Sequence, residues 1–300
     1  QGIQRGLEDR SVACMLPLMH DDIRKMRAIK DAEEIELMRH AQSITDAAFQ
    51  HMLGFIKPGM TEKQVRNELE NFMFANGADS LAFGSIVASG PNTANPHAVP
   101  SDRVIEKGDF VLMDYGAGYC DYRSDMTRTV VMGEPTQEQL DLYALVRRTH
   151  EECVAAIHPG VEGNDIFRLS KKIIGDAGYG DYYNHGLGHG VGIDIHELPN
   201  FNRSKNIIEV GSVITMEPGV YLPGVGGVRL EDYGVVTENG RYSAWYAEDG
   251  IHIANGDAAR YLTSARVVSW QEAAVDPTDG YDIPIRYTAV ASYTGTATSK

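Results

Sequence analysis

The sequence predicts an α+β protein made of two α/β halves related by a pseudo-twofold axis. A plan of helix, Pro-Gly, helix and Gly occurs twice, and the Pro-Gly pairs at 58–59 and 159–160 are 101 residues apart. In addition, VIEKGDFVLMDYG (104–116) aligns without gaps on IIEVGSVITMEPG (207–219), with five of the thirteen pairs identical. A repeat of this length predicts that a functional site lies at the seam between the halves.

Two helices are expected in the first half. Residues 30–53 carry an apolar stripe, and Asp31 with Glu34 has the spacing of a capping box at the start of that helix. Thr61 and Gln64 have the same spacing and predict a second helix that ends near residue 77.

The second half repeats these signals. Thr136 with Gln139 predicts a third helix, which runs to about Ile157 and stops at a Pro-Gly pair. A fourth helix follows, with apolar residues at helical spacing, and ends near Gly178.

Two hairpins with facing acids are expected after the helices. The midpoint of Asp114 and Asp125 falls between residues 119 and 120, and the midpoint of Glu217 and Glu231 falls at Gly224, inside a turn-rich stretch. Each pair of carboxylates should then lie roughly opposite across its ladder, where like charges repel. A single hairpin acid is usually a solvated surface residue. Four acids in two matched hairpins, two of them within apolar strands, instead indicate a bound cation.

The stretch HGLGHGVGIDIHELP (185–199) supplies histidines on a glycine-rich backbone. Glycines let the backbone approach another segment closely while a histidine projects past it. A lone histidine there is more often a structural hydrogen-bonding residue, but the four carboxylates favour His189 as a nitrogen ligand. One imidazole with four carboxylates suits Mn²⁺, Co²⁺, Fe²⁺ or Zn²⁺. The four negative charges match two divalent cations that share a hydroxide.

Composition excludes several classes of protein. The chain has 42 acidic and 27 basic residues and a net charge of −15, so we expect neither nucleic acid nor membrane as a partner. No apolar run is long enough to span a bilayer and no signal-peptide pattern opens the sequence, which predicts a cytoplasmic protein. Cys14, Cys120 and Cys153 lack metal or redox spacing and are expected to be ordinary thiols.

The motifs together resemble those of a known family. DYGAGYCDYRSDMTRTVVMG, HGLGHGVGIDIHELP, MEPGVYLPGVGGVRLEDYGVVTENG and NPHAVP are similar to the metal-dependent Xaa-Pro peptidases, prolidase and aminopeptidase P, of peptidase family M24. The resemblance covers about residues 26–240. It implies the pita-bread fold, in which two pseudo-twofold related halves surround a curved antiparallel sheet.

The resemblance also implies roles for individual residues. It implies that two metal ions are held by Asp114, Asp125, His189, Glu217 and Glu231, with Asp125 and Glu231 bridging. His97 and His196 would orient the substrate and stabilise the tetrahedral intermediate, and Glu217 would shuttle a proton. His185 and Arg229 match positions that line the substrate pocket.

We therefore expect a metallopeptidase that hydrolyses Xaa-Pro bonds in proline-containing peptides, as a dipeptidase or an aminopeptidase, with a hydroxide bridging two metals. Mn²⁺ is the first expectation, with Co²⁺, Zn²⁺ or Fe²⁺ as alternatives, and the assembly is expected to be a homodimer. A methionine aminopeptidase-like enzyme, a small-amide hydrolase and a non-catalytic binding module on the same fold stay open.

Three regions are expected along the chain. Residues 1–25 are expected to be a remnant or linker of an N-terminal region, and residues 26–270 the catalytic domain. Residues 271–300 are expected to form a C-terminal extension, because a Thr/Ser-rich tail with weak patterning is typical of disorder.

Overall fold

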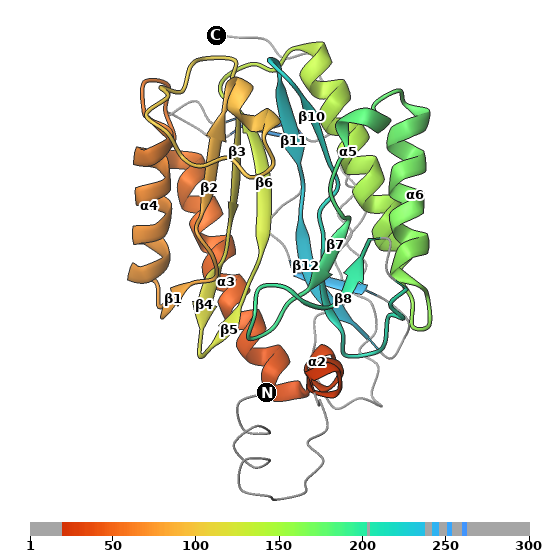
Figure 1. Ribbon diagram of the computed structural model, residues 1–300. Coiled ribbons are helices and arrows are strands. Elements are labelled where there is room, and N and C mark those ends of the chain that lie inside the picture. The colour runs from red at the N-terminus through yellow and green to blue at the C-terminus, as the bar shows by residue number, and fades with distance from the viewer. Residues whose placement is uncertain (1–19, 203–204, 238–241, 246–250, 254–259, 263–300) are drawn as a thin grey trace, which may run out of the picture.

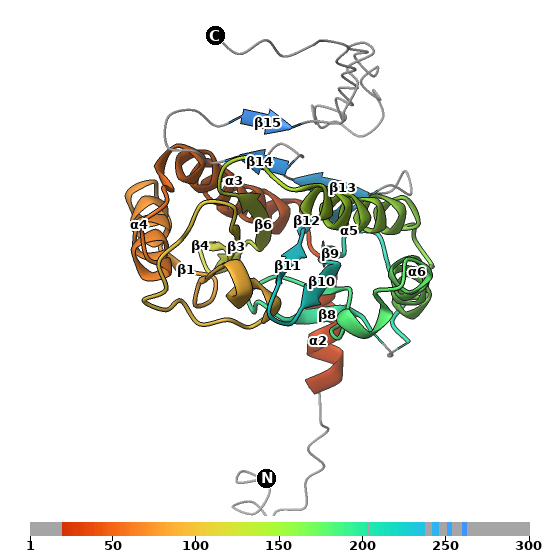
Figure 2. The same cartoon turned by 90° about the horizontal axis from the view of Figure 1, so that it is seen from above.

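The computed structural model describes residues 20–202, 205–237, 242–245, 251–253 and 260–262. Within these residues, two helices flank each side of a central set of strands (Figures 1 and 2). Helices α3 (Ala32–Phe55) and α4 (Glu62–Ala75) cover one side, and α5 (Gln137–Ala155) and α6 (Gly163–Asp176) cover the other. The fold is the α+β pita-bread arrangement that the sequence predicts.

The predicted capping boxes begin three of these helices. Both reciprocal hydrogen bonds are present at Asp31 with Glu34 for α3, and equally at the Thr61 and Thr136 boxes that begin α4 and α5. Helix α6 follows Glu162 without a side-chain cap. The four predicted helices are thus confirmed, with ends shifted by about two residues.

One helix was not predicted. Helix α2 (His20–Ala28) has no apolar stripe of the length that predicts a helix, but its charges suit one. Asp21 and Asp22 lie in its first turn and Lys25 and Arg27 in its last turn, where they complement the helix dipole. Arg27 then forms ion pairs with Asp194 and Glu197 of the second half.

The strands in the described part of the chain form two five-stranded sheets and two small ones. The first sheet contains, in spatial order, β15 (Arg260–Leu262), β14 (Ile251–Ile253), β6 (Met126–Val131), β3 (Phe110–Tyr115) and β2 (Ile86–Ser89). The second contains β13 (Tyr242–Trp245), β12 (Asp232–Val236), β9 (Val213–Met216), β7 (Gly188–Gly190) and β8 (Glu197–Phe201). The small sheets contain β1 (Ser80–Leu81), β4 (Ala117–Tyr119) and β5 (Tyr122–Arg123), and the β10 (Gly219–Leu222) and β11 (Gly226–Arg229) hairpin.

The two halves meet where β6 lies beside β11 and β12 (Figure 1). An isolated antiparallel bridge pairs Thr127 with Glu231, and the Glu231 N–H donates to the Thr127 carbonyl at 3.1 Å. This bridge links the two main sheets at the seam. Asp125 lies just before β6 and Glu231 just before β12, so the seam also brings one acid from each half together.

The internal repeat is visible in the strand pairing. Two isolated bridges occupy matching places, Thr61 with Val104 at the start of α4 and Glu162 with Ile207 at the start of α6. In both halves, a helix start is therefore tied to the segment that leads into the central strand. The two aligned segments, 104–116 and 207–219, begin at these bridges and contain β3 and β9 respectively.

One predicted register is right and the other is wrong. In the second hairpin, Met216 of β9 pairs with Asp232 of β12, and Gly219 of β10 pairs with Arg229 of β11. Both pairs have the same register, so Glu217, which lies between β9 and β10, is across from Glu231. In the first hairpin, the partner of Asp114 is Thr127 and not Asp125. The turn residues are Cys120 and Asp121, both with positive φ, so the turn lies one residue later than expected.

This correction does not separate the two aspartates. Asp125 is two residues before Thr127, and side chains two residues apart in a strand point to the same face. Asp125 therefore lies diagonally from Asp114 and still faces the same side.

The apolar core lies between the helices and the strands. Met52 of α3, Leu69 of α4 and Met113 of β3 belong to one fully buried cluster, and Val146 of α5 and Ile174 of α6 belong to another. The helices thereby hold the central strands from outside and leave the opposite faces of the strands free to form a site.

Several predictions concern residues outside those described. Residues 271–300 lie entirely outside them, as do residues 1–19 of the expected N-terminal region and Cys14. Residues 20–25 belong to α2, so the expected boundary near residue 25 falls inside a helix. None of the described helices has the length and apolar content that crossing a bilayer requires.

Candidate active site

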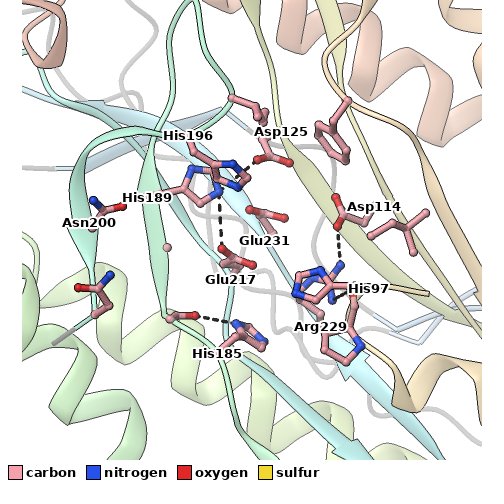
Figure 3. A pocket seen from close by; sticks show the side chains of 17 residues that line it. His97, Asp114, Asp125, His185, His189, His196, Asn200, Glu217, Arg229 and Glu231 are labelled. Atoms are coloured by element: carbon pink, nitrogen blue, oxygen red, sulfur yellow. Dashed lines mark hydrogen bonds and ion pairs between the residues drawn. The ribbon is translucent and has the colours of Figure 1, made fainter. Parts of the chain in front are cut away.

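A cavity of about 360 Å³ lies at the seam between the two halves. All of the site residues predicted from the sequence line it (Figure 3). They are His97, Asp114, Asp125, His185, His189, His196, Glu217, Arg229 and Glu231. Because the first and last are 134 positions apart, only the pairing of the two halves brings them together.

The acids and His189 form the centre of the site. Asp125, His189 and Glu231 each offer one atom to a group in which all atoms lie within 4.8 Å of one another. Glu231 lies between Asp125 and Glu217 in Figure 3. His189 Nε2 is 3.6 Å from Asp125 Oδ2 and 3.7 Å from Glu217 Oε1, distances too long for hydrogen bonds.

The tautomer of His189 follows from its neighbours. Its Nδ1 is 3.0 Å from the Gly190 carbonyl, which can only accept a hydrogen bond, so Nδ1 carries the proton. Burial, and then the neighbouring His196, lower the pKa of His189 to about 4. The ring is therefore neutral at pH 7, and the lone pair of Nε2 is directed toward the acids.

Burial and mutual repulsion act on the four carboxylates. Burial, followed by the charge of Glu231, raises the pKa of Asp125 and Glu217 well above their usual range. Burial, followed by Asp114, raises the pKa of Glu231 to about 8. Thr127 Oγ1 donates to Glu231 at 2.7 Å, which favours the ionised form but does not outweigh burial.

A network of hydrogen-bonded side chains lines the side of the cavity next to Asp114. Arg229 Nη2 donates to Asp114 Oδ2 at 2.5 Å, and Arg229 Nη1 donates to the hydroxyl of Tyr221 at 2.9 Å. His185 Nδ1 is 2.7 Å from the Gly186 carbonyl and therefore carries the proton, so His185 Nε2 accepts from Tyr221 at 2.8 Å. Burial, and then Arg229, lower the pKa of His185 to about 3, so this ring is neutral.

His97 and His196 lie at the edge of the cavity and are exposed. Figure 3 shows His97 beside Arg229 and Asp114, and His196 beside His189 and Asp125. The rings of His189 and His196 lie 4.4 Å apart between centroids, at an angle of 69°. The two exposed histidines therefore approach the acid cluster from different sides.

The sequence model of metallopeptidase family M24 matches residues 36–238, which include every one of these cavity residues. The chain belongs to metallopeptidase family M24. This M24 chain is 43% identical over 221 residues to an Xaa-Pro dipeptidase of Pyrococcus furiosus, an alignment that covers 73% of this chain and 64% of the relative.

Solved structures of M24 proteins agree with the fold. An Xaa-Pro dipeptidase from Bacillus anthracis is 42% identical, has a TM-score of 0.74, and is matched over 78% of this chain and 65% of its own. An X-Pro aminopeptidase from Thermotoga maritima is 35% identical with a TM-score of 0.76, over 81% of this chain and 68% of its own. The chain spans about 63% of the length of the curated relatives it matches.

The M24 cavity has the donors that divalent metal ions require. Asp114 Oδ1 is buried and has no hydrogen-bond partner among the described residues, and His189 offers a free lone pair. Four acids that repel one another around a neutral imidazole form a set that cations would stabilise, because the ions neutralise the charge that burial penalises. Oxygen-rich sets with one imidazole suit Mn²⁺, Fe²⁺, Co²⁺ and Zn²⁺.

Sequence reasoning missed some residues of the M24 site. Thr127 bonds Glu231 and Arg229, and Tyr221 joins Arg229 to His185. Tyr221 lies in the quoted motif MEPGVYLPG, so the signal was present, whereas the pairing of Thr127 with Glu231 depends on contact between the halves. Asn200 and Asn202 also line the cavity.

Proposed function

We propose that this chain hydrolyses the bond before proline in Xaa-Pro peptides, with two divalent metal ions held by Asp114, Asp125, His189, Glu217 and Glu231. The observation that carries the proposal is the convergence of four carboxylates, three of them buried and Glu217 partly buried, and one neutral imidazole in a single cavity. The names of the similar proteins, Xaa-Pro dipeptidase and X-Pro aminopeptidase, support proline peptides as the substrate class.

Two bound metal ions would supply the nucleophile and activate the substrate. When bound, two such ions lower the pKa of a shared water, so that a hydroxide is available near neutral pH, and they polarise the scissile carbonyl. Asp125 and Glu231, one from each half, would hold the ions together with Asp114, His189 and Glu217. Mn²⁺ is our first expectation for the metal, followed by Co²⁺, Zn²⁺ and Fe²⁺.

The residues around the ligands provide acid, base and hydrogen-bond functions. His97 and His196 are exposed to the cavity and would donate hydrogen bonds to the oxygen that becomes negative during attack. Glu217 would receive the proton of the attacking water and deliver it to the proline nitrogen as this nitrogen leaves.

The peptide itself would lie against the Arg229 side of the cavity. Arg229 and His185 are held by Tyr221, so their positions are set before a substrate binds. The nitrogen of an Xaa-Pro bond carries no hydrogen, so the site needs no hydrogen-bond acceptor opposite that nitrogen. It needs instead a cavity whose shape fits the proline ring. Homodimer formation and a cytoplasmic location stay predictions from the sequence.

The experiment is a substrate panel on protein reconstituted with Mn²⁺, Co²⁺ or Zn²⁺. Cleavage of Leu-Pro and not Leu-Pro-Gly would indicate a dipeptidase, and cleavage of both an aminopeptidase, with Leu-Gly as the matched control. Release of methionine from Met-Ala-Ser without cleavage of Leu-Pro would instead indicate a methionine aminopeptidase. The proposal would be refuted if the protein binds two metal ions but cleaves no Xaa-Pro peptide with any of the three metals.

A further inference from the structure

A single buried carboxylate holds both ends of the segment that carries His97. Glu62, the first residue of α4, has no exposed surface and accepts five hydrogen bonds. Ser89 donates from its backbone N–H at 2.7 Å and from its hydroxyl at 2.8 Å, and Asn92 Nδ2 donates at 3.0 Å. Ser101 donates from its N–H at 2.9 Å and from its hydroxyl at 2.6 Å.

We propose that Glu62 is a positioning residue for His97, because it closes the 89–101 loop at its base and thereby sets where His97 enters the cavity. The inference rests on the proposed function, since it gives His97 a part in hydrolysis. Glu62 itself does not line the cavity.

The charge of Glu62 is held by donors rather than by a direct ion pair. Burial alone would raise the pKa of Glu62, but hydrogen bonds from Ser101, Asn92 and Ser89 together lower it. The start of α4 adds a favourable dipole at this position. Arg103 also holds Ser89 in place, because its Nη1 donates to the Ser89 hydroxyl at 2.7 Å and to Asp109 at 2.6 Å.

The tip of the loop has hydrogen bonds within itself, such as the one from the His97 N–H to Asn95 Oδ1 at 3.0 Å, but fewer to the rest of the protein. Thr93 is buried and its Oγ1 accepts from the Gly227 N–H at 2.7 Å, which holds the first part of the loop against β11. Beyond it, His97 is exposed and Val99 is 83% exposed. The Pro96 carbonyl receives a long 3.3 Å hydrogen bond from Arg229. The position of His97 therefore depends strongly on the closure of the loop at Glu62.

The main test is Glu62→Gln combined with His97→Ala. An amide keeps the size of the carboxylate but replaces one acceptor oxygen with an NH₂ group, which can only donate. The hydrogen bonds from either Ser89 and Asn92 or Ser101 are therefore lost. We expect kcat on an Xaa-Pro substrate to fall about ten- to a hundred-fold, the effect of a misplacement of about 1 Å, while metal content stays unchanged. In the His97→Ala background the same change should have no further effect on kcat.

Asp102→Asn is the matched control. Asp102 adjoins the same loop end and pairs with Lys63 at the start of α4, but its side chain is 82% exposed. This variant should have the activity of the wild type. Ser101→Ala is the second variant, for use if Glu62→Gln does not fold, and should give a smaller loss of kcat that also disappears in the His97→Ala background.

Two results would overturn the proposal. One is wild-type kcat in Glu62→Gln, and the other is an equal loss of kcat with and without His97, which would indicate a general structural role. Hydrogen exchange of the amides of residues 92–99 gives a readout that does not need catalysis. Exchange should be faster in Glu62→Gln than in Asp102→Asn, and equal rates would overturn the proposal even if the wild type cleaves no Xaa-Pro peptide.

Discussion

An added methyl group should be poorly tolerated at Gly190, although it would contact no metal ligand directly. It lies in β7 between β8 and β9, and pairs with Glu197 on one side and Ile214 on the other. A Cβ at Gly190 would lie 2.1 Å from the Leu198 carbonyl oxygen, 2.4 Å from its carbon and 3.0 Å from Pro199 N. All three are backbone atoms of β8, so no side-chain rotation can relieve the contact.

The size of the effect follows from these distances. Real Cβ atoms essentially never lie within 3.0 Å of another heavy atom of this kind, so β7 and β8 must separate by about 1 Å in Gly190→Ala. Overpacking of this kind costs about 1–3 kcal/mol of unfolding free energy. His189 precedes Gly190 and His196 lies just before β8, so the same movement displaces both histidines and should lower kcat about a hundred-fold.

Gly175→Ala is the control for this substitution. Gly175 lies within α6, and nothing lies within 4 Å of a Cβ built there. Alanine should therefore raise the unfolding free energy by up to about 1 kcal/mol, because it favours the helix. Urea unfolding and steady-state hydrolysis of an Xaa-Pro peptide measure both variants. Gly190→Ala with wild-type stability and activity would show that β7 and β8 do not fix the histidines as argued.

Two further predictions concern the site, and a third concerns a thiol buried in the apolar core. Because burial and then Asp114 raise the pKa of Glu231 from 4.5 to about 8, metal-free protein should lose stability as pH rises from about 5 to 8. Thermal melts with EDTA should show this loss and melts with Mn²⁺ should not. His196→Ala should lower kcat by about 10² to 10³ with unchanged metal content, whereas His189→Ala should lose metal and activity together, as metal analysis and kinetics can show. Burial, and then Glu152, raise the pKa of Cys153 to about 12, so in a Cys14→Ser, Cys120→Ser variant this thiol should react with a disulfide reagent only after unfolding.

The sequence was most informative where local signals were complete. The three capping boxes located α3, α4 and α5, because a side chain and a backbone N–H three residues apart are enough to begin a helix. The facing of Glu217 and Glu231 was also predictable, since their turn is symmetric about Gly224.

Elsewhere local signals were insufficient. The two-residue turn at Cys120 and Asp121 requires positive φ at both residues, which neither side chain strongly predicts, and the register was therefore misplaced. Helix α2 is short and polar, and its ion pairs with Asp194 and Glu197 join residues more than 160 positions apart.

Contacts between the halves explain most of what the sequence did not reveal about the site. The repeat indicated a seam, but the bond from Thr127 to Glu231 and the chain through Tyr221 depend on how the two hairpins pack. The anchoring of the His97 loop by Glu62 is of the same kind, because three separate segments meet at one carboxylate.

The central claim is that the acids and His189 hold two divalent ions that this chain needs for Xaa-Pro hydrolysis. It is tested most directly by titrating metal-free protein with Mn²⁺ while measuring bound metal and Leu-Pro cleavage in the same samples. We expect no cleavage without metal, and activity that increases until two ions are bound per chain. Full activity in the presence of EDTA, or binding of two ions with no cleavage under Mn²⁺, Co²⁺ or Zn²⁺, would contradict the account.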